Sequence, residues 1–100
     1  MRYEKQSEDT VLVFPNKALN IANAEAFKEE LSNLLEAGFW KITFDFSRVE
    51  ELDSAGLGKI LVFHKKLREH GGELKIINVV QGQIKKMFDL IQLDRLIHID

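Results

Sequence analysis

Strand-type and helix-type stretches alternate along this chain, and this alternation restricts its fold more than any other feature. Short runs of β-branched and aromatic residues indicate strands, whereas apolar residues three and four apart indicate amphipathic helices. A polar turn between the first two strands predicts a β-hairpin. The expected elements, in chain order, are strands at 2–6 and 10–14, a helix from about 23 to a stop at Gly38, a strand at 40–46, a helix at 54–70 followed by two glycines, a strand at 74–79, a helix at 81–91 and a short strand at 96–99.

This order predicts an α/β fold with a mixed sheet of four to five strands. Strands joined by a single helix need right-handed crossovers, so the second, third and fourth strands should be parallel, with the first antiparallel at an edge. The strand at 40–46 alternates strictly, and its polar residues, Asp45 among them, should face away from the core, so we expect helices mainly on one face. Loops at the carboxyl ends of the parallel strands, at about 15–23, 47–54 and 78–82, should gather on one rim, where such sheets carry their sites.

The composition excludes several classes of function. We treat the 100 residues as a single domain over 1–100 with one core. The chain has no cysteine, so it can form no disulfide and can offer no thiolate to a metal or a substrate. A net charge of -2 gives no basic footprint for nucleic acid or anionic lipid, and the polar first residues do not form a secretory signal. We expect a cytoplasmic protein that binds neither nucleic acid nor membrane, and a monomer.

No residue pattern indicates an active site. The segment Gly56-Leu57-Gly58 lacks the third glycine of a dinucleotide fingerprint, no GxxxxGK[ST] phosphate loop is present, and Ser54 lacks the flanking glycines of a hydrolase nucleophile. The three histidines form no HxxxH or HxH pair. Glu50, Glu51 and Asp53 could in principle hold Mg²⁺, although a solvated acidic loop explains them better. We expect no enzyme, no catalytic residue, no metal and no cofactor.

The segment from Asp53 to Gly58, at the start of the second helix, is the most informative one. Either Asp53 or Ser54 can cap this helix, because a side-chain oxygen there accepts a hydrogen bond from a backbone N–H that has no partner within the helix. Capping does not explain Gly56 and Gly58, since glycine within a helix costs about 1 kcal/mol relative to alanine. Two glycines in the first turns indicate that another backbone or surface approaches closely, as at a docking site.

The chain resembles the STAS-domain anti-sigma factor antagonists of bacteria over nearly its whole length. Residues 53–58, which read DSAGLG, resemble the family signature D-S-[ST]-G-L-G. The helix that ends in Gly71-Gly72-Glu73-Leu74 and the stretch 84–90 resemble the family as well. The resemblance implies a STAS-like fold. It also implies that Ser54 is the serine phosphorylated by the anti-sigma factor, which in this family is a GHKL-type serine kinase.

The resemblance further implies a partner switch. The unphosphorylated antagonist binds the kinase-type anti-sigma factor and frees the sigma factor, phosphorylation ends the binding, and a serine phosphatase resets the cycle. The phosphate would meet exposed N–H groups at the helix start, so the domain should stay folded. Asn20 stands where the family often has aspartate. The docking residues implied by the resemblance, together with part of the 78–82 loop, are Asn20, Ile21, Asn23, Asp53, Ala55, Gly56, Leu57, Gly58 and Lys59.

Two other functions stay open. A STAS module that is never phosphorylated could act as a constitutive scaffold, or as a subunit of another assembly, and would keep its partner whatever the state of Ser54. A nucleotide-binding or hydrolysing domain would turn over ATP or GTP without any added protein, although the missing phosphate loop argues against it.

Overall fold

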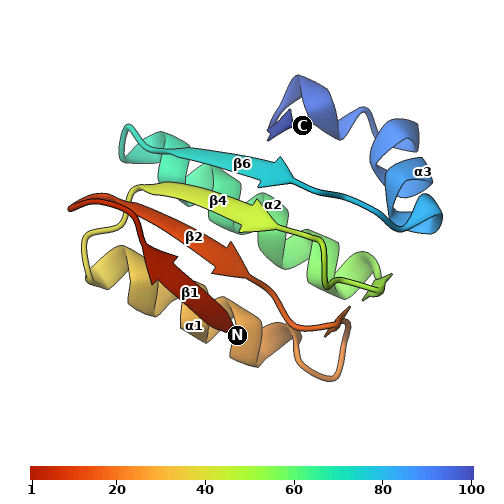
Figure 1. Cartoon of the computed structure of the whole chain (residues 1–100), viewed down its shortest axis with the longest axis horizontal. Coiled ribbons are helices and arrows are strands. Elements are labelled where there is room, and N and C mark those ends of the chain that lie inside the picture. Colours follow the sequence, from red (N-terminus) through yellow and green to blue (C-terminus); the bar gives the residue numbers. More distant parts are fainter.

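The computed structural model describes residues 1–100 and confirms the predicted order of elements, with three additions (Figure 1). In chain order the elements are β1 (Arg2–Lys5), β2 (Thr10–Phe14), β3 (Ala18–Leu19), α1 (Ala24–Glu36), β4 (Lys41–Asp45), β5 (Glu51–Leu52), α2 (Ser54–Glu69), β6 (Glu73–Ile77), α3 (Gly82–Leu90), the 3₁₀ turn η1 (Leu93–Arg95) and β7 (His98–Ile99). The short strands β3 and β5 and the turn η1 are not among the expected elements. None of the helices combines the length and the apolar character needed to cross a membrane.

Backbone conformation explains where several elements end. Gly38 and Gly71, with φ of 96° and 77°, follow α1 and α2 in the left-handed conformation that terminates helices. β6 ends at Ile77, two residues earlier than predicted, because Asn78 takes a left-handed conformation with φ of 57°. The terminal strand β7 is confirmed, in a form shorter than the predicted 96–99.

Five strands form the main sheet, in the order β1-β2-β4-β6-β7. β1 pairs antiparallel with β2 at one edge, and the pairs β2 with β4, β4 with β6 and β6 with β7 are all parallel. This arrangement confirms the predicted mixed sheet. The carboxyl ends of the parallel strands therefore meet at one rim, which we call the carboxyl-end rim.

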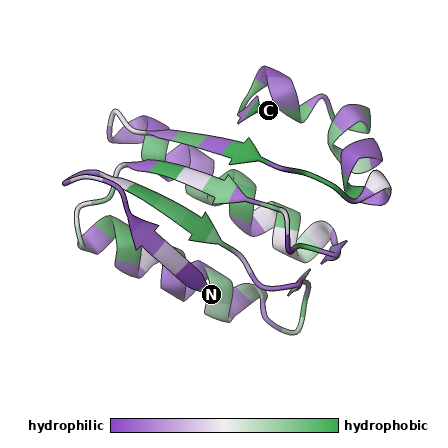
Figure 2. Cartoon of the chain, in the orientation of Figure 1, coloured by the Kyte–Doolittle hydropathy of each residue, from purple (hydrophilic) through white to green (hydrophobic).

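Helices α1 and α2 lie side by side on one face of this sheet (Figure 1). Phe44 of β4 is fully buried between them, with its ring 6.0 Å from that of Phe27 in α1 and 6.1 Å from that of Phe63 in α2. Figure 2 shows hydrophobic residues concentrated in the central strands and hydrophilic residues in the edge strand β1. The expectation that helices cover mainly one face is therefore confirmed.

After β6 the chain continues into α3, beyond the carboxyl end of that strand, and returns through η1 to β7, which pairs with β6 (Figure 1). Phe88 of α3 joins this segment to the core, because its ring lies 5.9 Å from that of Phe46 after β4. Leu93 and Ile97 are also buried there. These side chains belong to the same continuous hydrophobic core as the central strands, and they hold α3 and η1 against the sheet.

Asp45, at the end of β4, is the one charged side chain that is buried, at 8% exposure. The alternation of residues 40–46 predicts an exposed polar position, and this is wrong because the carboxylate is enclosed by its hydrogen bonds. It accepts from the backbone N–H of Ser47 at 2.9 Å and from the side chain of Asn78 at 3.1 Å. Burial raises the pKa of Asp45, but these hydrogen bonds outweigh it and the net pKa is lowered.

A second, two-stranded sheet brings two loops of the carboxyl-end rim together. β3 pairs parallel with β5, with Ala18 opposite Glu51 and Leu19 opposite Leu52. The carbonyl of Leu19 also accepts a hydrogen bond from the backbone N–H of Asp53 at 3.1 Å. The loop before α1 is therefore fixed to the residues that begin α2.

Candidate functional site

Asp53 connects the start of α2 to the loop before α1. Its backbone is extended, and one carboxylate oxygen accepts from the backbone N–H of Gly56 at 2.9 Å, so Asp53 is the cap of α2. The other oxygen accepts from the backbone N–H of Ile21 at 3.0 Å. The Gly56 hydrogen bond is the main cause of a lowered pKa for Asp53, so the carboxylate is ionised at neutral pH.

The loop before α1 is closed by its own side chains. Asn23 accepts from the backbone N–H of Asn20 at 3.0 Å and donates to the carbonyl of Ala18 at 2.6 Å. Asn20 in turn accepts from the backbone N–H of Ala22 at 3.0 Å. These bonds hold the loop while leaving the side chain of Ile21 80% exposed. The neutral Asn20 side chain therefore helps to fix the conformation of this loop.

Ser54 is the first residue of α2 and is exposed to solvent. Because Asp53 caps the helix, the Ser54 hydroxyl is not needed for that purpose. The sequence did not distinguish Asp53 from Ser54 as the helix cap, and the hydrogen bond from the Gly56 N–H identifies Asp53. An exposed serine that performs no capping is accessible to a modifying enzyme.

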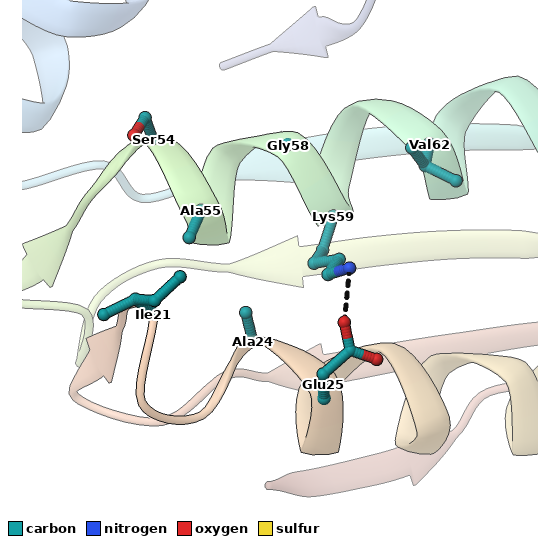
Figure 3. Close-up of a pocket in the computed structure, with 8 residues that line it drawn as sticks. All are labelled: Ile21, Ala24, Glu25, Ser54, Ala55, Gly58, Lys59 and Val62. Atoms are coloured by element: carbon teal, nitrogen blue, oxygen red, sulfur yellow. Dashed lines mark hydrogen bonds and ion pairs between the residues drawn. The ribbon is translucent and has the colours of Figure 1, made fainter.

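A groove of about 360 Å³, which we call the α1–α2 groove, runs between the first turns of the two helices (Figure 3). Ser54 lies at its edge, and Ile21 and Ala55 point toward one another across it. The amine of Lys59 lies 2.8 Å from a carboxylate oxygen of Glu25, so an ion pair crosses from α2 to α1. This hydrogen bond is the main cause of a lowered pKa for Glu25. The residues that line the groove are Ile21, Ala24, Glu25, Ser54, Ala55, Gly58, Lys59 and Val62.

The two glycines of α2 have different surroundings. A Cβ on Gly56 would lie 2.5 Å from the carbonyl oxygen of Leu19, so the prediction of a close backbone approach holds for this residue. A Cβ on Gly58 would meet nothing within 4 Å. Gly56 is therefore required by packing within the chain, whereas Gly58 leaves open space in the α1–α2 groove.

The structure brings most of the expected docking residues to one place, with three exceptions. Gly56 is buried against Leu19, and Leu57 packs against the core. The 78–82 loop contributes to a different groove beside α3, described below. The remaining residues lie in or beside the α1–α2 groove: Asn20, Ile21, Asn23, Asp53, Ser54, Ala55, Gly58 and Lys59.

Sequence reasoning missed Glu25 and Val62 as members of this groove. Val62 is 50% exposed and, with the 80% exposed Ile21, forms apolar surface that lines the groove. Its spacing of four residues from Gly58 places both on one helix face, and this signal was available in the sequence. Of the N–H groups at the start of α2 that were expected to meet a phosphate, that of Gly56 already donates to the Asp53 carboxylate.

The histidines lie apart from this groove. His64 has a buried Nδ1 without a hydrogen-bond partner, and burial lowers its pKa. The ring of His70 stacks on Trp40, and that of His98 lies 3.2 Å from Asp100. No group of three histidine or acidic side chains is placed to hold a metal ion.

Known proteins resemble this chain over nearly its whole length. The sequence model of the family described as "STAS domain" matches residues 3–100. A Thermotoga maritima protein named "Putative anti-sigma factor antagonist" is 34% identical over 93 residues, covering 92% of this chain and 81% of the relative. The Bordetella bronchiseptica protein BtrV, similarly described, is 31% identical over 72 residues, covering 72% of this chain and 61% of BtrV.

Solved structures resemble it as well. The crystal structure of a putative anti-sigma factor antagonist from Thermotoga maritima has a TM-score of 0.87 at 34% identity, covering 98% of this chain and 83% of that one. The anti-sigma factor antagonist SpoIIAA, in its unphosphorylated form, has a TM-score of 0.83 at 20% identity, covering 99% and 86%. Phosphorylated SpoIIAA has a TM-score of 0.77 at 20% identity, covering 99% and 89%. At this identity the likeness to SpoIIAA is one of fold.

Proposed function

The chain belongs to the STAS-domain family of anti-sigma factor antagonists, and from this premise we propose that it binds a kinase-type anti-sigma factor through the α1–α2 groove until Ser54 is phosphorylated. While bound, the kinase is kept from its sigma factor, which is then free. A serine phosphatase hydrolyses the phosphoester on Ser54 and restores binding. This is a regulatory function, in which the chain supplies an interaction surface and a substrate hydroxyl.

The exposure of Ser54 at the edge of the α1–α2 groove is the observation that carries this proposal. The hydroxyl can be modified without loss of the helix cap, since Asp53 performs the capping. Ile21 and Val62 expose apolar surface on the same groove, which is typical of a protein interface. SpoIIAA, which has the same fold, is known in both phosphorylated and unphosphorylated forms.

The phosphoryl transfer needs only a hydroxyl from this chain. Oγ of Ser54 forms a bond to the γ-phosphorus of ATP while the bond from that phosphorus to the β,γ-bridging oxygen breaks, and ADP leaves. The hydroxyl proton passes to a base of the kinase. ATP, Mg²⁺ and the base all belong to the kinase, so no nucleotide or metal site is needed here.

Phosphorylation would end the binding through local charge. A phosphate adds about -1.5 to -2 charge, and on Ser54 it would stand next to the ionised Asp53. The N–H of Gly56 already donates to Asp53, so it is not free for the phosphate, which depends on water for part of its stabilisation. Docking a partner over it removes that water, at a cost of several kcal/mol. The fold need not change.

Incubation with a GHKL-type anti-sigma kinase, ATP and Mg²⁺, followed by intact mass and site mapping, tests the modification. We expect one phosphate on Ser54 and none on Ser54→Ala. In titrations with the same kinase, wild type and Ser54→Ala should bind alike, and Ser54→Glu should bind about 10- to 100-fold more weakly. Equal affinities for wild type and Ser54→Glu would contradict the switch and favour a constitutive scaffold.

Ser7→Glu is the matched control, because it introduces the same charge on an exposed serine in the turn between β1 and β2. That turn is at the opposite end of the sheet from the α1–α2 groove (Figure 1). We expect its affinity for the kinase to equal that of wild type. An equal loss in both glutamate variants would indicate a response to net charge and not to the position of Ser54.

A further inference from the structure

The segment after β6 forms a second groove, of about 520 Å³, between the end of β6, α3 and the last residues of the chain. We call it the carboxyl-terminal groove. It shares no lining residue with the α1–α2 groove, and the proposed function makes no use of it. Part of the predicted 78–82 loop lies here, because Asn78, Val79 and Val80 line this groove.

The base of the carboxyl-terminal groove is apolar. Phe88 and Val79 are core residues, 4% and 8% exposed, that reach its surface, and Val80 is 61% exposed beside them. Ile99, at the end of β7, completes the apolar part of the lining. A concave apolar base of this kind, framed by polar residues, is typical of an interaction site.

The walls of the groove carry an excess of negative charge. Three carboxylates line it, those of Asp89, Asp94 and Asp100, against the single amine of Lys85. No ion pair of the chain involves Asp89, Asp94 or Lys85, and Asp100 has only His98 near it. An apolar base with unpaired carboxylates at its edge is complementary to an apolar segment that carries lysine or arginine.

We propose that the carboxyl-terminal groove docks a basic, apolar segment of a partner protein. An apolar side chain of that segment would cover Val79 and Phe88, while its cationic side chains would lie against Asp89 and Asp94. Since Ser54 lies outside this groove, docking here is independent of phosphorylation and is compatible with a kinase held at the α1–α2 groove. The chain would then present two surfaces to two partners.

Two blocked hexapeptides test this proposal, LKKLFK and its acidic counterpart LEELFE, titrated to about 1 mM into the ¹⁵N-labelled full chain. We expect LKKLFK to shift the amide signals of residues that line the carboxyl-terminal groove and to leave those of the α1–α2 groove unchanged. Added salt should weaken the binding of LKKLFK, because it screens the ionic contacts. LEELFE should cause no shift. Equal shifts from both peptides, shifts outside the groove, or none at all would overturn the proposal.

Charge-removing variants locate the contact. Asp89→Asn and Asp94→Asn should each weaken LKKLFK binding about two- to fivefold, because each removes one exposed ionic contact. Glu29→Gln, an exposed residue of α1 with no ion pair, is the matched control and should bind as wild type does. Unchanged binding in both aspartate variants would overturn the proposal that charge selects the partner.

The oligomeric state in solution, measured by analytical ultracentrifugation, tests the alternative occupant. A mass of two chains that returns to one chain in Val80→Ser would overturn the proposal and show that a second copy covers the groove.

Discussion

The α1–α2 groove and the carboxyl-terminal groove are built on the same plan but differ in charge. In each, one aspartate fastens a loop to the end of a regular element: Asp53 holds Ile21 to the start of α2, and Asp45 holds Asn78 to the end of β4. Both aspartates have a lowered pKa because of the hydrogen bonds they accept. Buried or capping carboxylates thus position both surfaces of the carboxyl-end rim.

The difference lies in how each groove neutralises its own charges. Lys59 and Glu25 pair across the α1–α2 groove, so its lining is balanced. The carboxylates of Asp89 and Asp94 in the carboxyl-terminal groove have no cationic partner. If both proposals hold, one added phosphate changes the charge of a balanced groove, whereas the acidic groove attracts a basic partner whether or not Ser54 is modified.

The largest effect is expected from the packing that sets the α1–α2 groove in place. Gly56→Ala puts a Cβ against the carbonyl of Leu19 and should lower the free energy of unfolding by about 2–3 kcal/mol, because backbone on both sides cannot move away easily. Urea unfolding followed by circular dichroism measures this. A loss below about 0.5 kcal/mol would show that β3 can shift, and that the groove is less rigid than its contacts indicate.

The next effect concerns the aspartate that holds the carboxyl-terminal groove. Asp45→Asn should lower stability at pH 7 by about 1–2 kcal/mol, because a buried acceptor of two hydrogen bonds becomes poorly satisfied. The folded pKa of Asp45 is lowered, so its ionic contribution is present above about pH 4 and is lost as the pH falls through the folded pKa. The free energy of unfolding, measured at pH 7 and at pH 3, should therefore differ less between Asp45→Asn and wild type at pH 3 than at pH 7.

Gly58→Ala should stabilise the fold, whereas Gly56→Ala should destabilise it. Gly58→Ala adds about 0.5–1 kcal/mol to the free energy of unfolding, since the new methyl group meets open space and alanine favours a helix. The same methyl group narrows the α1–α2 groove, so the kinase should bind more weakly. Parallel urea unfolding and titration check both parts. A variant that binds as tightly as wild type would show that the partner does not approach Gly58.

The smallest effect on stability is expected from a pair of exposed valines, one in each groove. Val62→Ser and Val80→Ser should each change stability by less than about 0.5 kcal/mol, because both side chains are at least half exposed. Val62→Ser should weaken only kinase binding and Val80→Ser only LKKLFK binding, as measured by titration of both variants with both ligands. If either variant weakens the binding of both ligands, the two grooves are coupled and are not separate binding surfaces.

Periodicity was enough to predict the main sheet and its helices, but not the contacts that build the grooves. β3 and β5 have two residues each, which is too short to show an alternation of apolar and polar residues. They form because they pair with each other, although their partner residues are 33 positions apart in the sequence. The burial of Asp45 depends on Asn78, which no local pattern connects to it. The roles of Gly56 and Gly58 separate only once the position of Leu19 is known.

The stacking of Trp40 on His70 makes the chain its own spectroscopic reporter. Trp40 is the only tryptophan, and its ring lies 4.7 Å from the imidazole at an angle of 20°. It stands before β4, where its carbonyl accepts from the N–H of Glu73 at the start of β6, so it is at the opposite end of the sheet from both grooves. Unfolding separates the two rings, while a partner at either groove leaves them in place. Tryptophan emission can therefore follow unfolding of this chain in the presence of its ligands.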